Sequence, residues 1–234
     1  MELPVIIALA LCAAAGYLLG SISWSIILTK KVSGEDIRNQ GSGNAGMTNV
    51  LRTVGKLPAI LTFAGDFLKC VAAALLAWGI IILGFQLAGH SEAPDFELTQ
   101  IAKFLAGAGC VLGHAFPLYH GFRGGKCIVT SAAMILMTDW RVFLLILATF
   151  GIVFLVKRII SLGSVCCAAL YPVYTFLLTY RIDYLEQGCS VRYLQFVMLL
   201  SVGVCVLVLW KHRANIGRLR RGEEKPIRAK KTEK

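Results

Sequence analysis

Long stretches without a charged residue alternate with short charged segments along the chain. The longest stretches cover residues 4–28, 70–88, 104–122, 159–180 and 193–210, and shorter ones lie at 127–138 and 142–156. A helix needs about 20 apolar residues to cross the hydrocarbon core of a bilayer. The pattern therefore predicts an all-α integral membrane protein that crosses the membrane several times.

The segment "MTDWRV" decides the number of crossings, because it separates the two shorter stretches. If both are crossings, the chain has about seven transmembrane helices, at residues 4–28, 57–84, 101–119, 124–139, 141–156, 159–180 and 192–210. The ten Lys and Arg residues from Lys211 onward then lie in the cytoplasm, as the positive-inside rule favours. We expect the N-terminus outside, and the fourth helix to begin near Gly124.

The composition agrees with a membrane protein. Only 16% of the residues are charged and 57% are apolar, whereas about a quarter of a typical soluble domain is charged. The net charge of +11 is concentrated in the basic tail, so we attribute it to contact with anionic lipid and expect no nucleic-acid partner. We predict one membrane domain over residues 1–220 and a basic, flexible cytoplasmic tail over 221–234.

The eight cysteines lie mostly within apolar stretches and form no Cys-x-x-Cys pair. Buried free cysteine behaves as a small hydrophobic residue. We therefore expect neither a metal site nor a cofactor.

The longest inner loop contains the glycine-rich stretch "NQGSGNAGMTNVLRTVGK". Its glycines have the spacing of a dinucleotide fingerprint, but no buried strand precedes them, which excludes that fold. Small residues still allow backbone N–H groups to converge on an anion. The candidate phosphate-binding residues here are Gly41, Ser42, Gly43, Asn44, Gly46, Thr48, Asn49 and Arg52. The alternative is a polar turn between two helices.

A second candidate is "HGFRGGKCIV", in which Gly124, Gly125 and Lys126 begin the predicted fourth helix. The stretch does not match a P-loop, because His120 and Cys127 replace its first glycine and its Ser or Thr. A helix N-terminus nevertheless binds anions through its free amides. The alternative is that the cations only anchor the chain at the membrane surface.

Further polar residues interrupt the apolar helices. Asp66 and Lys69 are three residues apart, and form either a structural ion pair or the floor of a site. His114 precedes the Gly-Gly-Lys segment and could equally be a core residue. Ser161 and Ser164 lie in "KRIISLGS", and could bond the backbone of their own helix. His212 and Asn215 share one face of a helical continuation, whose arginines are expected at the membrane surface.

In this order, "GSGNAGMTNVLRTVGK", "GDFLKC", "GHAFPLYHGFRGGKCIVT", "SLGS" and "HRANIGRLRRGEE" resemble the bacterial acyl-phosphate:glycerol-3-phosphate acyltransferase family. The resemblance runs from Leu18 to Glu224. It implies a seven-helix enzyme of the bacterial cell (inner) membrane with a cytoplasmic active site. Such an enzyme transfers an acyl group from acyl phosphate to the 1-hydroxyl of glycerol 3-phosphate, giving lysophosphatidic acid and inorganic phosphate.

The resemblance also implies roles for particular residues. The positions that match functional residues of the family are Ser42, Arg52, Lys126, a serine of "SLGS", His212 and Asn215. The chain departs from the family pattern at Ala45 (usually proline), Met47 (usually alanine), Arg123 (usually lysine) and Cys127 (usually glycine).

An acyl phosphate is already activated, so we expect direct transfer without a covalent intermediate. The proton acceptor is either a phosphate oxygen of a substrate, which we favour, or His212. Expected partners are the two substrates, the bilayer and an enzyme that could supply acyl phosphate. The competing hypothesis is a membrane transporter for an organic phosphate or another anion.

Overall fold

The computed structural model describes residues 2–224 and 226 of the chain. In this part of the chain every regular element is a helix, as predicted. The α-helices are α1 Leu3–Gly20, α2 Trp24–Ser33, α3 Met47–Thr53, α4 Lys56–Leu87, α5 Phe96–Ala115, α6 Ile128–Thr138, α7 Trp140–Lys157, α8 Ile160–Leu178, α9 Val191–Lys211 and α10 Arg213–Arg220. Short 3-10 turns lie at Ile37–Asn39 and Leu118–His120, and a π-helical turn, Thr179–Tyr184, extends α8.

Within the described residues, six helical segments are long and apolar enough to cross a membrane. They are Leu3–Ser33, Lys56–Leu87, Phe96–His120, Trp140–Lys157, Ile160–Tyr184 and Val191–Lys211. The remaining predicted crossing, 124–139, corresponds to the 11-residue helix α6. A helix of that length spans only about 16 Å, so the count of seven and the sides of the two termini stay predictions.

The structure differs from the prediction within one crossing and at the start of another. The first crossing is interrupted, because α1 ends at Gly20 and Ser21 to Ser23 separate it from α2. The hydroxyl of Ser21 donates to the carbonyl of Tyr17 at 2.8 Å and accepts from the backbone N–H of Leu118 at 3.1 Å, so the end of α1 is bonded to the turn after α5. Helix α6 begins at Ile128 and not near Gly124, because Cys127 before it has a left-handed backbone with φ of 66°.

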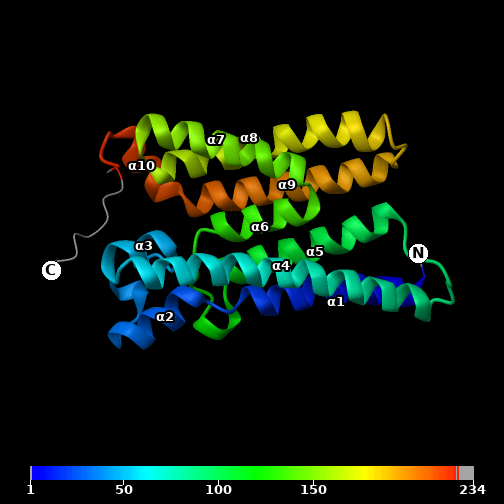
Figure 1. Ribbon diagram of the computed structural model, residues 1–234, viewed down its shortest axis with the longest axis horizontal. Helices are drawn as coiled ribbons and strands as arrows, with labels where there is room; N and C mark the ends of the chain where they lie inside the picture. The colour runs from blue at the N-terminus through cyan, green and yellow to red at the C-terminus, as the bar shows by residue number, and fades with distance from the viewer. Residues whose placement is uncertain (1, 225, 227–234) are drawn as a thin grey trace.

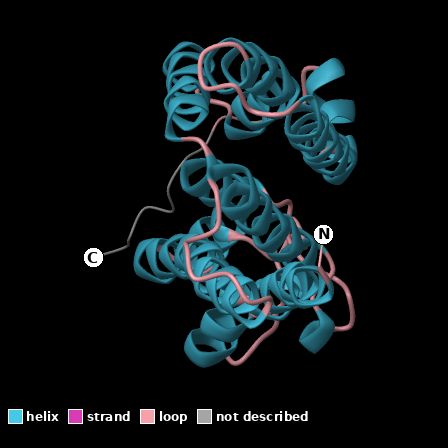
Figure 2. Ribbon diagram, turned by 90° about the vertical axis from the view of Figure 1, so that its right-hand side faces the viewer, coloured by secondary structure: helices cyan, strands magenta, loops and turns pink. Residues whose placement is uncertain are grey.

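The long helices form two groups (Figure 1). Helices α1, α4 and α5 pack on one another as the N-terminal bundle, and α7, α8 and α9 pack as the C-terminal bundle. Helix α6 contacts α4, α5 and α7, and so lies between the bundles. Seen from one end of the molecule, the two groups are distinct (Figure 2).

Glycine allows the closest contact in the N-terminal bundle. A Cβ atom on Gly16 would lie 2.0 Å from the carbonyl oxygen of Ala106, and one on Gly109 would lie 2.3 Å from that of Ala13. Gly20 and Gly113 make equivalent approaches, so α1 and α5 touch backbone to backbone along two Gly-x-x-x-Gly segments. Membrane helices commonly associate through such small residues.

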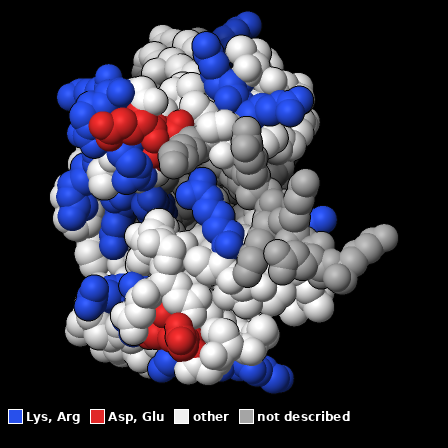
Figure 3. Space-filling model, turned by 90° about the vertical axis from the view of Figure 1, so that its left-hand side faces the viewer, with Lys and Arg blue, Asp and Glu red and all other residues white. Residues whose placement is uncertain are grey.

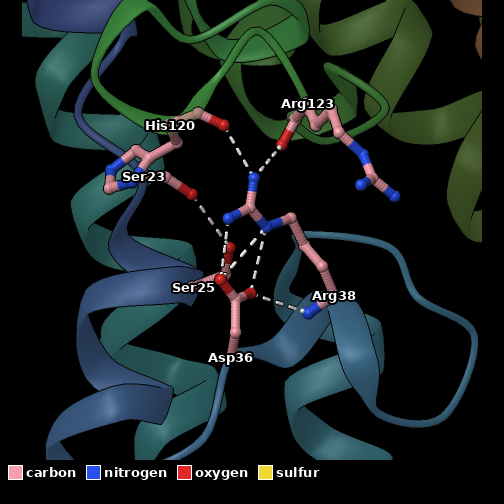
Figure 4. A network of polar contacts seen from close by, with 6 residues as sticks. All are labelled: Ser23, Ser25, Asp36, Arg38, His120 and Arg123. Carbon is pink, nitrogen blue, oxygen red and sulfur yellow. Dashed lines mark hydrogen bonds and ion pairs between the residues drawn. The ribbon is translucent and has the colours of Figure 1, made fainter.

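The loops at the end of the molecule that holds α2, α3 and α10 are tied together by Arg38 (Figure 4). Its guanidinium pairs with Asp36 at 2.7 Å and donates to the carbonyls of His120 at 2.7 Å and Arg123 at 3.4 Å. Arg38 therefore holds the glycine-rich loop beside the segment before α6. The ion pair with Arg38 also lowers the pKa of Asp36. Other Lys and Arg side chains are spread over the same end of the molecule (Figure 3).

All eight cysteines are free thiols, and six of them are buried. This agrees with the prediction that they act as packing residues.

Candidate active site

A cavity of about 440 Å³ lies between the two bundles, and every helix from α3 to α10 contributes to its wall. One end is polar. It is formed by Ser42, Asn44, Thr48, Asn49, Arg52, Lys126, Ser161, His212, Asn215, Arg218 and Glu224. The rest is mostly apolar, with Asp66, His114, Ser131 and Ser164 as polar exceptions. Its apolar side chains come from α4, α6, α7, α8 and α9 and include Phe67, Ile135, Phe143, Ile146, Phe150, Ala168, Tyr171, Val204 and Val208. The cavity therefore suits a ligand with an anionic head and a hydrocarbon tail.

Lys126 is the cation at the centre of the polar end. It lies in the connection before α6, and its ammonium donates to the amide oxygen Oδ1 of Asn215. Burial, together with the nearby charges of Arg218 and Arg52, lowers the pKa of Lys126 to about 8, although the charge of Glu224 acts in the opposite direction. A phosphate dianion bound here would stabilise the charged form of this lysine.

Glu224 holds three of the cavity's side chains together. Its Oε1 accepts from the hydroxyl of Ser161 at 2.6 Å and from Nδ2 of Asn215 at 2.7 Å. Its Oε2 pairs with Nε of Arg218 at 2.5 Å. Although burial opposes ionisation, these hydrogen bonds and the charge of Arg218 lower the pKa of Glu224. Asn215 thus connects Lys126 with a carboxylate that is charged at neutral pH.

His212 joins α9 to α10 and is 3% exposed. Its Nδ1 lies 2.8 Å from the carbonyl oxygen of Val208, which can only accept, so Nδ1 carries the proton. Burial lowers the pKa of the ring. The ring is therefore neutral, and Nε2 carries an unshared electron pair. This is the state that a general base requires.

Comparison with known proteins identifies the family. Residues 10–222 match the family model described as glycerol-3-phosphate acyltransferase. The chain belongs to this family. It is 42% identical over 211 residues to the glycerol-3-phosphate acyltransferase of Thioalkalivibrio sulfidiphilus, with 90% of each chain covered. It is 37% identical over 219 residues to that of Clostridioides difficile, with 94% and 95% covered.

Two solved structures share the fold. Both are of PlsY (YgiH), an integral membrane glycerol 3-phosphate acyltransferase. The glycerol 3-phosphate form matches with a TM-score of 0.71 and 30% identity, covering 94% of this chain and 96% of that one. The lysophosphatidic acid form matches with a TM-score of 0.70 and 28% identity, covering 94% and 95%. This chain is thus an integral membrane acyltransferase by family.

The structure brings most of the predicted residues to one cavity. The predicted residues that line it are Ser42, Asn44, Gly46, Thr48, Asn49, Arg52, Asp66, His114, Lys126, Ser161, Ser164, His212 and Asn215. Gly41, Gly43, Gly124, Gly125 and Lys69 are not among the residues that line it. Segments far apart in sequence, as predicted, meet at one end of the bundle.

Gly124 and Gly125 do not offer free amides, contrary to the prediction. Their N–H groups donate to the carbonyls of Ala115 and His114 at 3.3 and 3.1 Å. A Cβ atom on Gly125 would lie 2.2 Å from Nε2 of His114, and one on Gly124 would lie 2.0 Å from the carbonyl oxygen of His114. The glycines therefore allow the connection to lie against the end of α5, which positions Lys126.

Asn49 organises the glycine-rich loop. Its Oδ1 accepts from the backbone amide of Ser42 at 2.9 Å, and its Nδ2 donates to the carbonyls of Ile37, Gln40 and Asn44. The side chain is 2% exposed and its polar atoms are all occupied. Asn49 therefore shapes the loop, and Ser42, Asn44, Thr48 and Arg52 remain as the polar side chains of this segment that face the cavity.

Asp66 and Lys69 are an ion pair, with 2.8 Å between Oδ1 and Nζ, and Asp66 also lines the cavity. The predicted ion pair is therefore present, and the role of this pair as the floor of a site stays a prediction. Lys69 also donates to the carbonyl of Ile22 at 2.7 Å and lies 3.1 Å from Nδ1 of His114. The group links α4 with α5 and with the break after α1. The hydroxyl of Ser164 donates to the carbonyl of Ile160 at 3.0 Å, which is the helical alternative predicted for it.

Sequence reasoning missed Glu224 and Arg218. Glu224 was assigned to the flexible tail and Arg218 to the membrane surface, but both line the cavity. Of the predicted tail, residues 225 and 227–234 lie outside the described residues. The motif "HRANIGRLRRGEE" did contain both residues, yet nothing in its periodicity indicates that a terminal glutamate turns back to Ser161.

Proposed function

We propose that this protein transfers a fatty acyl group from an acyl phosphate to the 1-hydroxyl of glycerol 3-phosphate, forming lysophosphatidic acid and inorganic phosphate. The observation that carries the proposal is the division of one cavity into a cationic end and an apolar end. The glycerol 3-phosphate and lysophosphatidic acid forms of a structural relative support both the acceptor and the product.

In the proposed reaction the 1-hydroxyl oxygen bonds to the acyl carbonyl carbon. The bond from that carbon to the phosphate oxygen breaks, and inorganic phosphate leaves with the electron pair. Arg52 and Lys126 neutralise phosphate charge, and Ser42 and Asn215 orient the reactants. Holding two reactants in this way can contribute about 7–11 kcal/mol to lowering the barrier.

The hydroxyl proton goes either to a phosphate oxygen of a substrate or to Nε2 of His212. His212→Ala separates these routes. A fall in turnover of about 10²–10⁴-fold with unchanged glycerol 3-phosphate binding would assign the proton to the histidine. A smaller fall would assign it to the substrate.

We also propose where the reaction takes place. The polar end of the cavity lies at the end of the molecule that carries α10, from which the basic tail continues. The positive-inside rule then puts the active site at the cytoplasmic face of the bacterial inner membrane. Residues 1–220 form the membrane domain in this proposal, with Glu224 as an anchor beyond it.

The transporter hypothesis fits the cavity less well. Carriers commonly bind their substrate near the midplane of the bilayer, between related halves of the chain. Here the cationic and amide side chains lie at one end of the cavity, and mostly hydrocarbon side chains line its middle.

The test is release of inorganic phosphate from palmitoyl phosphate by the purified protein in detergent, with and without glycerol 3-phosphate. Release should require the acceptor, and Lys126→Ala should reduce turnover by about 10²–10³-fold or more. Lys31→Ala, an exposed lysine of α2, is the matched control and should retain activity. Transport of labelled glycerol 3-phosphate into vesicles without conversion would overturn the proposal.

A further inference from the structure

The apolar end of the cavity closes at two side chains, Ile135 of α6 and Tyr171 of α8. They are 4% and 3% exposed, and both line the cavity. Tyr171 follows Ser161 by ten residues on the same helix, which places it about 15 Å from the polar end. A hydrocarbon tail that enters along α8 therefore meets the tyrosine ring at the bottom.

Beyond these two side chains there is much less empty space. A second, much smaller cavity of about 10 Å³ shares Ile135 and Tyr171 as its wall. Its other lining residues include Thr138, Asp139, Thr175, Thr179 and Asp183. That volume is about enough for one water molecule. Phe104, Val142 and Tyr193 complete the lining, which is therefore partly polar and partly apolar. The space is too small for a longer tail.

We propose that Tyr171, supported by Ile135, sets the longest acyl chain that the enzyme accepts. The proposal rests on the proposed function. Each methylene that becomes buried strengthens binding about fourfold, so a chain that reaches the ring gains from every carbon above it. A longer chain has to bend or displace the ring, and loses that advantage.

Two substitutions on one wall of the cavity should move the limit in opposite directions. Tyr171→Ala removes the ring and joins the large cavity to the small one. Ala168 lines the same wall one helical turn nearer to Ser161 and is 8% exposed. Ala168→Leu therefore raises the floor of the cavity.

The experiment measures kcat/KM for lauroyl, myristoyl, palmitoyl, stearoyl and arachidoyl phosphates with each purified variant. Tyr171→Ala should raise the ratio of the longer to the shorter donors about tenfold or more, and Ala168→Leu should lower it. Two controls accompany them. Tyr171→Phe keeps the ring and should keep the wild-type profile. Phe176→Ala removes an aromatic ring of the same helix that lies outside the cavity and is 44% exposed, and should also leave the profile unchanged.

Folded variants with an unchanged chain-length profile would overturn the proposal. Equal loss of activity with every donor in Tyr171→Ala, together with an unchanged profile in Ala168→Leu, would do the same. If Tyr171→Ala does not fold, Ala168→Leu and Ile135→Ala decide by the same ratio. A wild-type protein that transfers no acyl group at all would instead refute the proposed function, and the role of Tyr171 with it.

Discussion

The N-terminal and C-terminal bundles are held together by different means. In the first, α5 has 61% of its most apolar stretch buried, and its glycines touch the backbone of α1. In the second, α7 has only 11% of the corresponding stretch buried. A Cβ atom on Gly151 of α7 or Gly203 of α9 would meet no atom within 4 Å. One bundle packs backbone on backbone, and the other packs through side chains around a cavity.

The difference explains how one small membrane protein handles a polar and an apolar substrate group together. The tightly packed bundle carries the glycine-rich loop and the connection with Lys126, so the side chains proposed to bind phosphate rest on a closely packed base. The C-terminal bundle supplies most of the hydrocarbon wall. At the end of this bundle that carries α10, Glu224 fixes Ser161, Asn215 and Arg218 by hydrogen bonds.

The largest expected effect comes from breaking the backbone contact of the N-terminal bundle. Gly109→Leu places a branched side chain where even a Cβ atom would lie 2.3 Å from the carbonyl oxygen of Ala13, so α1 and α5 have to separate. We expect a loss of about 3 kcal/mol or more, since the rigid backbone cannot relax as a side chain would. Thermal unfolding in detergent measures the loss.

Gly203→Leu is the matched control, because it adds the same side chain in open space on α9. It should leave the midpoint of unfolding nearly unchanged. If both variants unfold at the same temperature, the two bundles do not differ in the way described.

The sequence predicted more of the fold than of the site's finer contacts, for physical reasons. Apolar stretches reveal helices because each one must satisfy the bilayer on its own, and all the long helices were recognised. The start of α6 was misplaced because paired glycines and a lysine resemble a helix N-terminus, whereas the amides of Gly124 and Gly125 bond to α5. Glu224 was missed because its partners Ser161 and Asn215 are set by tertiary structure, which leaves no periodic signal.

The next largest effect should come from loosening the end of the C-terminal bundle that carries α10. Glu224→Gln removes the charge that pairs with Arg218 and replaces one acceptor by a donor. Hydrogen bonds to charged groups contribute about 1.5–3 kcal/mol each, so we expect kcat/KM to fall by about 10–100-fold. Steady-state phosphate release measures the fall.

Glu223→Gln is its control. The neighbouring Glu223 pairs only with Arg221 in the described part of the chain, and that pair is exposed to solvent. Exposed pairs contribute little, so this variant should behave as wild type. Equal losses in the two variants would mean that general charge at this end, and not the contacts of Glu224, supports activity.

A smaller effect is expected from pH, and it tests whether Lys126 is the phosphate-binding cation. Its pKa of about 8 means that the free enzyme carries the charge below pH 8 and loses it above. Phosphate esters are already dianions in this range. The KM for glycerol 3-phosphate should therefore rise by up to about tenfold per pH unit above 8. In Lys126→Arg, which stays charged, the rise should disappear; a rise that persists there would assign the titration to another group.

The smallest effect concerns the connection between the bundles. Cys127 has a left-handed backbone, φ 66°, at a position where the family resemblance predicts glycine, and its thiol donates to the carbonyl of Val111 at 3.4 Å. A side chain in this conformation costs about 1 kcal/mol. Both Cys127→Gly and Cys127→Ala lose the contacts of the thiol. The difference in stability between the two variants therefore measures the cost of a Cβ atom in the left-handed conformation. We expect the glycine variant to be more stable than the alanine variant by about 1 kcal/mol in thermal unfolding.

Cys70, which is buried within α4 of the N-terminal bundle, provides the control. Here Cys70→Ala should be more stable than Cys70→Gly, because glycine destabilises a helix interior relative to alanine by about 1 kcal/mol. If the glycine and alanine variants rank in the same order of stability at Cys127 and at Cys70, the left-handed backbone before α6 does not account for the difference between this connection and the helices.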